Sequence, residues 1–260
     1  MVASTAPLRF GSVRPLVRYV DDRQAVIDTH FQTFAAPDDS GPTPGTPRTV
    51  EVLIDVDGDD GFHDEGTTRI AVRGGHGSFR FEIVEPERWW PAGMGEQPLY
   101  TFSVRLLVDD HVVDRAEFTL GLASVRRDHA LGEDFGPQHL DNGRIHTVRD
   151  VVVVDRVDEN QLLPATGESL LLVRDHYGYE SLYDAADRAG ILLIQSVPID
   201  PDADPAAAVR DQVDRLAAHP SLAGYYVGHL GKLCAKVSRQ LRKLDPTRMV
   251  CRDFPELPAA

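Results

Sequence analysis

The chain has 260 residues, of which 42% are hydrophobic, and carries a formal net charge of −14. This length accommodates one large domain or two ordinary ones, with room for a real hydrophobic core. The negative charge argues against general binding to nucleic acid. No apolar run approaches the ~18 residues that a membrane-spanning helix needs, so no membrane partner is expected.

Aspartate supplies most of the charge, since the chain has 29 Asp and 12 Glu against 24 Arg and 3 Lys. Such a surface is typical of proteins from salt-loving organisms. Residues 1–15 lack the charged and apolar segments of a secretion signal, which indicates a soluble cytoplasmic protein. Cys234 and Cys251 do not have a metal-binding spacing, so we expect buried free thiols, no metal and no cofactor.

Apolar and polar residues alternate in the first half of the chain, as they do in strands that bury one face. About seven short strands, separated by turn-rich segments such as residues 36–47, predict an antiparallel sandwich of immunoglobulin type over residues 13–127. Residues 55–65 have the acidic composition of a calcium loop, but their spacing does not fit one. We expect them to form a hairpin tip between two strands.

A different pattern follows a polar, turn-rich segment, residues 128–141, which is predicted to be a linker. Over residues 142–260, continuous apolar runs alternate with amphipathic segments, which predicts parallel strands joined by helices. The expected strands lie within residues 151–155, 169–178, 191–199, 221–228 and 248–254. The expected helices lie within residues 179–190, 204–220 and 232–244.

Several motifs occur in a consistent order from about residue 85 onward. The segment "ERWWPAGMGEQPLYTFSVRLL" (residues 87–107) resembles the immunoglobulin-like domain of glycoside hydrolase family 2, the β-galactosidase, β-mannosidase and β-glucuronidase group. Residues 172–198 resemble the second and third barrel strands of that family, and residues 215–229 resemble its fourth. Residues 241–250 resemble the segment that leads to the fifth barrel strand.

The resemblance implies two domains: an all-β immunoglobulin-like sandwich, then a partial (βα) barrel of about five parallel strands, which is a truncated TIM barrel. Trp89 and Trp90 would then pack within the sandwich. The family normally begins with a jelly-roll sugar-binding domain, and none is recognised before the sandwich. The first barrel helix is expected to be reduced, because residues 156–168 are few for a parallel crossover.

Catalysis in a retaining glycosidase needs two carboxyl groups about 5 Å apart. The resemblance implies an acid/base glutamate two residues after Gly228, where this chain has His229 and then Leu230. Leucine cannot carry a proton, and no acidic residue occurs between Asp214 and Asp245. The nucleophile would lie on a seventh strand, beyond residue 260. We therefore expect no catalytic residue.

Some residues that face the sugar in the family are retained. Arg174 and His176 match the family's second barrel strand, so the resemblance implies a carbohydrate ligand near them and near His229. The alternatives are structural: Arg174 in an ion pair with Asp175 or Asp187, and His229 as a hydrogen-bonded group.

Partners follow from the open edges that a partial barrel leaves on its first and fifth strands. We expect a homo-oligomer or a partner chain to cover them, and a flattened sheet packed on the sandwich is a third solution. The exposed face of the last helix has a basic stripe that suits either an acidic partner or solvent. Its members are Lys232, Lys236, Arg239 and Lys243.

The expected function is therefore that of a non-catalytic relative of family 2 glycosidases, acting as a carbohydrate-related binding or assembly module. The alternative is a glycosidase that hydrolyses O-glycosyl bonds only when a partner chain supplies the rest of the barrel.

Overall fold

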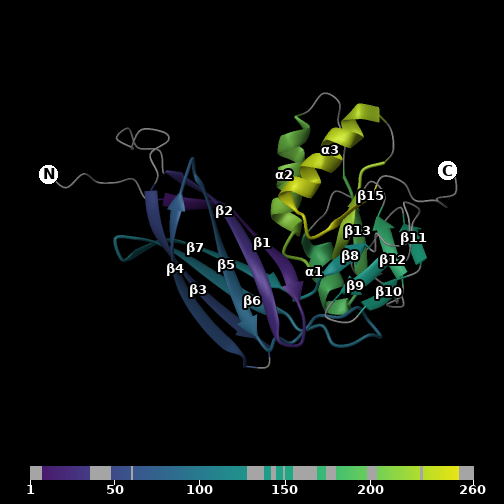
Figure 1. Ribbon diagram of the computed structural model, residues 1–260, viewed down its shortest axis with the longest axis horizontal. Coiled ribbons are helices and arrows are strands. Elements are labelled where there is room, and N and C mark those ends of the chain that lie inside the picture. The colour runs from purple at the N-terminus through teal and green to yellow at the C-terminus, as the bar shows by residue number, and fades with distance from the viewer. Residues whose placement is uncertain are drawn as a thin grey trace.

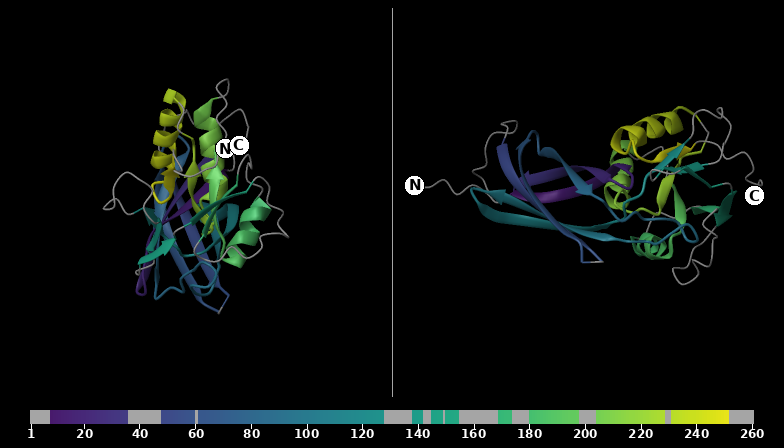
Figure 2. Two further views of the ribbon diagram at one scale, coloured as in Figure 1. Left: turned by 90° about the vertical axis from the view of Figure 1, so that its right-hand side faces the viewer. Right: turned by 60° about the horizontal axis from the view of Figure 1, so that its bottom comes forward.

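A sandwich of β-sheets and a small parallel sheet with helices make up the computed structural model (Figure 1). Figure 2 shows that the two parts follow one another along the long axis, with helices α2 and α3 side by side. The structure describes residues 8–35, 48–59, 61–127, 138–141, 145–148, 150–154, 169–173, 180–197, 204–228 and 231–251.

The sandwich consists of two antiparallel sheets, ordered β1-β2-β5 and β4-β3-β6-β7. Its strands are β1 (Leu8–Val20), β2 (Gln24–Ala35), β3 (Arg48–Gly58), β4 (His63–Val72), β5 (His76–Val84), β6 (Tyr100–Val108) and β7 (His111–Leu120). The predicted antiparallel sandwich is thus confirmed, and the acidic segment 55–65 is the β3–β4 hairpin, as expected. The fourth strand pairs with β3, whereas in constant immunoglobulin domains it joins the first sheet.

Alternation of side chains explains why these segments form strands. Val52, Ile54 and Val56 point into the core from β3 and are at most 2% exposed. The charged residues Glu51 and Asp55 alternate with them and lie at the surface side. The core buries one face of each sheet, and this burial is the main stabilising term of the sandwich.

The parallel sheet has the order β11-β12-β13-β14-β15. Its strands are β11 (Asp150–Val154), β12 (Ser169–Val173), β13 (Leu192–Ser196), β14 (Leu222–Tyr226) and β15 (Met249–Cys251). The predicted parallel strands are confirmed, but a partial barrel is not evident: in the described part of the chain the strands form one small open sheet. β11 and β15 are its two ends and do not meet, so the sheet does not close.

A third, antiparallel sheet lies between the two parts in sequence. It has the order β10-β9-β8, with β8 (Val125–Arg127), β9 (Gln138–Asp141) and β10 (Ile145–Val148). β9 therefore lies at the end of the segment predicted to be a linker, where it pairs with both neighbours.

Three helices join the parallel strands in the described residues: α1 (Glu180–Ala189), α2 (Pro205–Leu216) and α3 (Gly231–Leu244). Asp204 caps α2 by accepting a hydrogen bond from the backbone N–H of Ala206, and Pro205 occupies the first helical turn. Gly190 ends α1 with φ +70°, a conformation that favours glycine. None of the helices in the described ranges is long and apolar enough to cross a membrane.

One face of the parallel sheet packs against the helices and Leu16 of β1, and the other face packs against residues such as Trp89 and Ala123 that flank the sandwich strands. Trp89, from the connection between β5 and β6, is fully buried among Leu192, Ile194 and Ala223 of the second face. The expectation that Trp89 packs within the sandwich is therefore wrong. The motif carries no sign of this, because a large apolar side chain fits either core equally well.

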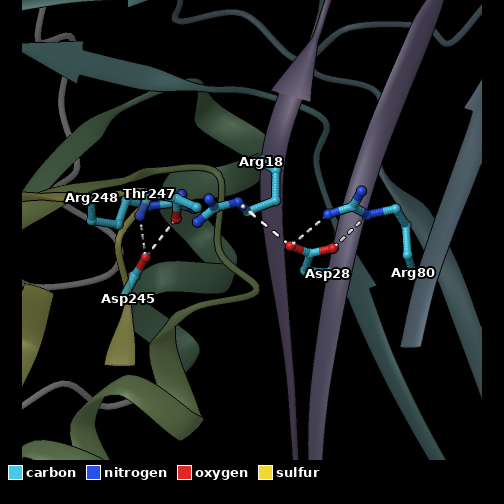
Figure 3. A network of polar contacts seen from close by, with 6 residues as sticks. All are labelled: Arg18, Asp28, Arg80, Asp245, Thr247 and Arg248. Atoms are coloured by element: carbon cyan, nitrogen blue, oxygen red, sulfur yellow. Dashed lines mark hydrogen bonds and ion pairs between the residues drawn. The ribbon is translucent and has the colours of Figure 1, made fainter. Parts of the chain in front are cut away.

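Asp28 lies between two arginines on the outer face of the first sandwich sheet (Figure 3). Its carboxylate accepts hydrogen bonds of 2.8 and 3.2 Å from Arg80 and lies 3.5 Å from the guanidinium of Arg18. The hydrogen bond from Arg80 lowers the pKa of Asp28 below its ordinary value, against a smaller opposing effect of burial.

We predict that Asp28→Asn lowers the free energy of unfolding by about 0.5–1 kcal/mol near pH 7. A carboxyl group whose pKa is lower in the folded state stabilises the fold above its unfolded pKa, about 3.9, and loses this effect as the pH falls through the folded value. The difference from the wild type should therefore shrink below about pH 4. Urea unfolding at several pH values measures this, with Asp22→Asn as the exposed control. A difference that stays constant down to pH 2 would contradict the assignment.

Candidate functional site

The C-terminal ends of parallel strands are where α/β proteins bind ligands, and the predicted site residues follow two such ends. Arg174 and His176 come after β12, while His229 and Leu230 come after β14. All four lie outside the described residues, so their roles stay predictions.

The connection after β14 is short enough to be read residue by residue. β14 ends at Tyr226 and α3 begins at Gly231, so residues 227–230 are the whole connection. Their side chains are an isopropyl group, a hydrogen, an imidazole and an isobutyl group. A carboxyl group is therefore missing from the connection in which the family's acid/base would lie.

The polar side chain of Gln195, near the end of β13, forms hydrogen bonds with its neighbours. Gln195 is fully buried, accepts a 2.6 Å hydrogen bond from the hydroxyl of Tyr183, and donates one of 2.6 Å to the carbonyl of Ser196. Burial raises the pKa of Tyr183 well above its ordinary value, so its hydroxyl stays protonated at neutral pH. This pair fixes α1 on the sheet.

A buried acid–imidazole pair lies at the opposite, N-terminal edge of the sheet. The carboxylate of Asp187, which is 3% exposed, contacts Nδ1 of His219 at 2.7 Å and accepts a 3.0 Å hydrogen bond from the backbone N–H of Ser221. The backbone carbonyl of Asp187 accepts a 2.8 Å hydrogen bond from the indole N–H of Trp89. We call Asp187, His219, Ser221 and Trp89 the junction cluster.

The connection between α2 and β14 also forms hydrogen bonds with Arg248, which directly precedes β15 and is drawn in Figure 3. Arg248 donates hydrogen bonds to the carbonyls of Ala217 and His219, at 3.5 and 3.1 Å. The buried carboxylate of Asp245 accepts hydrogen bonds from the N–H and hydroxyl of Thr247, at 3.0 and 2.5 Å. Residues 217–221 therefore have fixed partners on both sides.

Asp184, Asp187 and His219 offer ligand atoms that lie within 4.8 Å of one another. Each oxygen of the Asp187 carboxylate already has a hydrogen-bond partner, His219 or Ser221, while Asp184 lies at the surface. The chemistry of the cluster is therefore that of a structural contact between α1 and the α2–β14 connection, and it does not favour a cation. The sequence predicts Asp187 only as a possible partner of Arg174. Its place among the apolar positions of α1, next to Ala186, is the signal that could have indicated a buried role.

Surface grooves of the described residues include two on the sandwich. One, of about 480 Å³, lies between the outer face of β1 and β2 and the helix α2, and its lining includes Gln32, Phe34, Arg210 and Asp211. The other, of about 530 Å³, follows β4 and β5 and is basic. Its charged or titratable lining residues are His30, Arg69, Arg73 and His76.

The predicted basic stripe faces outward on α3. Its four members, Lys232, Lys236, Arg239 and Lys243, are exposed, and the opposite side buries Val237 and Leu241. This arrangement agrees with a solvated face, and an acidic partner for it stays a prediction.

Residues 38–122, which include β3 to β7, match the family model "Glycosyl hydrolases family 2". The chain is 28% identical over 124 residues to an exo-β-D-glucosaminidase of Streptomyces avermitilis, a match that covers 43% of this chain and 13% of that protein. The expected relation to family 2 glycosidases is thus confirmed at the level of the sandwich sequence.

Solved structures show the same fold over nearly the whole chain. A family 2 member from Bacteroides cellulosilyticus aligns with a TM-score of 0.71 and 18% identity, and covers 95% of this chain and 36% of its own. A Bacteroides uniformis β-glucuronidase aligns with a TM-score of 0.68 and 16% identity. This alignment covers 95% of this chain and 34% of the β-glucuronidase. The exo-chitosanase of Amycolatopsis orientalis aligns with a TM-score of 0.65 and 16% identity, and the alignment covers 95% of this chain and 32% of the exo-chitosanase. The chain spans about a third of the length of these proteins.

We predict that Asp187→Ala lowers the free energy of unfolding by about 2–5 kcal/mol, because it leaves the imidazole of His219 and the N–H of Ser221 buried without their acceptor. The matched control is Asp184→Ala, an exposed position on the same helix, with an expected change within about 0.5 kcal/mol. Urea unfolding followed by far-ultraviolet circular dichroism measures both. Equal effects of the two substitutions would show that the junction cluster is not a structural contact.

Proposed function

We propose that this relative of family 2 glycosidases is non-catalytic and acts as a carbohydrate-binding or assembly module. The observation that supports this most directly is the four-residue connection between β14 and α3, because none of its side chains is the carboxyl group that the double displacement requires. The proposal includes a cytoplasmic location and an Asp-rich surface adapted to salt.

The nearest acidic residues in sequence do not offer a substitute. Asp214 lies on α2, where it forms a 2.5 Å ion pair with Arg14 of the sandwich. Asp245 is fully buried, and its carboxylate is occupied by Thr247 and by the hydroxyl of Tyr225. A carboxyl group with these partners is not free to exchange a proton with a substrate.

A saccharide is the ligand class that we propose. The related protein from Streptomyces avermitilis is an exo-β-D-glucosaminidase, and a solved relative is an exo-chitosanase in complex with a β-D-glucosamine derivative. Glucosamine carries a positive charge near neutral pH, which suits a chain with a net charge of −14. Arg174, His176 and His229 remain the residues that we propose for the site at the strand ends.

A second candidate function follows from the two ends of the parallel sheet. The strand order β11 to β15 is sequential, as in the first five strands of a (βα)8 barrel, and this supports reading the sheet as a partial barrel. A partner chain that paired with β11 and β15 could then supply the missing strands and carboxyl groups. We propose self-association as the first way of covering these ends and such a partner as the second.

We predict that the purified chain does not hydrolyse aryl β-glucosaminides, β-galactosides, β-glucuronides or β-mannosides. Leu230→Glu should remain inactive too, because a single carboxyl group does not complete the double displacement. Release of nitrophenol measures this, and light scattering on the same sample separates a homo-oligomer from a monomer that awaits a partner. Turnover that disappears when one acidic residue of this chain is replaced would overturn the proposal.

A further inference from the structure

The groove between the sandwich and α2 contains an aromatic ring that the fold does not bury. Phe34 is 60% exposed at the end of β2, although phenylalanine is normally found in the core. It lines the groove of about 480 Å³, a volume within the range of small-molecule sites. An exposed ring beside a groove is a feature that sandwich stability does not require.

Gly11 fixes the position of this ring. A Cβ atom added to Gly11 would lie 2.1 Å from Cε2 of Phe34, so the ring occupies the space that any other side chain would need. Gly11 does not have a positive φ, so the backbone conformation itself does not require glycine. The glycine is therefore explained by the ring that lies against it, which holds Phe34 in one place beside the groove.

Groups that form hydrogen bonds surround the ring. Gln32 extends from the same face of β2, and Arg210 and Asp211 extend from α2. Arg210 is exposed, and neither it nor Gln32 has an ion pair or side-chain hydrogen bond in the described residues. Asp211 is 67% exposed, and within the described part of the chain its carboxylate pairs with Arg215.

The two walls of the groove are held at a fixed separation. The ion pair between Arg14 of β1 and Asp214 of α2 crosses from one wall to the other. Leu16 of β1 is buried in the same core cluster as Val209 and Val213 of α2. The groove therefore exists before any ligand arrives, which lowers the entropic cost of binding.

We propose that this groove binds a pyranose sugar without acidic substituents, stacked on Phe34. The apolar C–H face of a pyranose fits the negative face of an aromatic ring, and its hydroxyl groups fit amide, guanidinium and carboxylate partners. Asp214 and Asp211 of the lining are paired with Arg14 and Arg215, and the net charge of −14 of the chain disfavours an anionic sugar such as a uronic acid. This assignment rests on the proposed carbohydrate-binding function, but it concerns a different surface from the strand ends.

Isothermal titration calorimetry of the full chain tests it with three oligosaccharides: β-linked glucosamine, β-linked glucose and a β-linked uronate. Glucosamine or glucose oligomers should bind, and the uronate should bind at least about tenfold more weakly, a factor that corresponds to about 1.4 kcal/mol. Phe34→Ala should weaken binding at least about tenfold, while Phe34→Trp should retain it. Val84→Ala is the matched control, because Val84 is 70% exposed and does not line the groove.

Gly11→Ala is the second variant. Its methyl group must push the ring of Phe34 out of its position, although the phenylalanine itself is not replaced. It should weaken binding as Phe34→Ala does, with thermal unfolding curves recorded to show that both variants are folded. If a sugar binds and Phe34→Ala binds it as tightly as the wild type, the groove assignment is wrong and the proposed function stands. If none of the three sugars binds, the groove assignment and the carbohydrate-binding part of the proposed function are both overturned, and the assembly role stands.

Discussion

The buried carboxylate of Asp187 is the contact on which the arrangement of the two parts depends. A carboxylate that is 3% exposed is costly to bury unless it is fully hydrogen-bonded, and here His219 and Ser221 supply the partners. The carbonyl of the same residue accepts the indole N–H of Trp89, which comes from the sandwich side of the chain. One residue of α1 thus links the helix, the start of β14 and the connection between β5 and β6.

Other contacts at this boundary agree with a fixed arrangement. A Cβ atom at Gly121, just after β7, would lie 2.4 Å from the ring of Pro220, so these two segments of the chain approach closely there. Ala218 packs against the sandwich core, while its neighbour Ala217 belongs to the core under the helices. The groove beside Phe34 is a consequence of this arrangement, because one wall belongs to each part. The fold is shared with solved family 2 structures, and on such a common scaffold function resides in the sites placed on it.

Local patterns in the sequence were enough to predict most of the elements, but neither the strand β9 nor the long-range contacts. Alternation predicted the sandwich strands, and the Asp204–Pro205 start signal and Gly190 predicted helix ends that the structure confirms. The partner of Trp89 could not be predicted, because an indole ring is equally apolar in either core. Closure of the parallel sheet into a barrel could not be inferred from strand periodicity, since it depends on which strands meet at the ends. Phe34 was missed because an alternating pattern does not reveal which outward residue borders a groove.

The central claim is that the junction cluster makes the sandwich and the parallel sheet one cooperative unit. Native-state hydrogen exchange of backbone amides in β6 and β13 tests it most directly, because these strands belong to different sheets and the cluster lies between them. The account predicts that both strands exchange with the same free energy, equal to that of global unfolding, and lose protection at the same urea concentration. Exchange of β13 at a free energy several kcal/mol below that of β6 would contradict it.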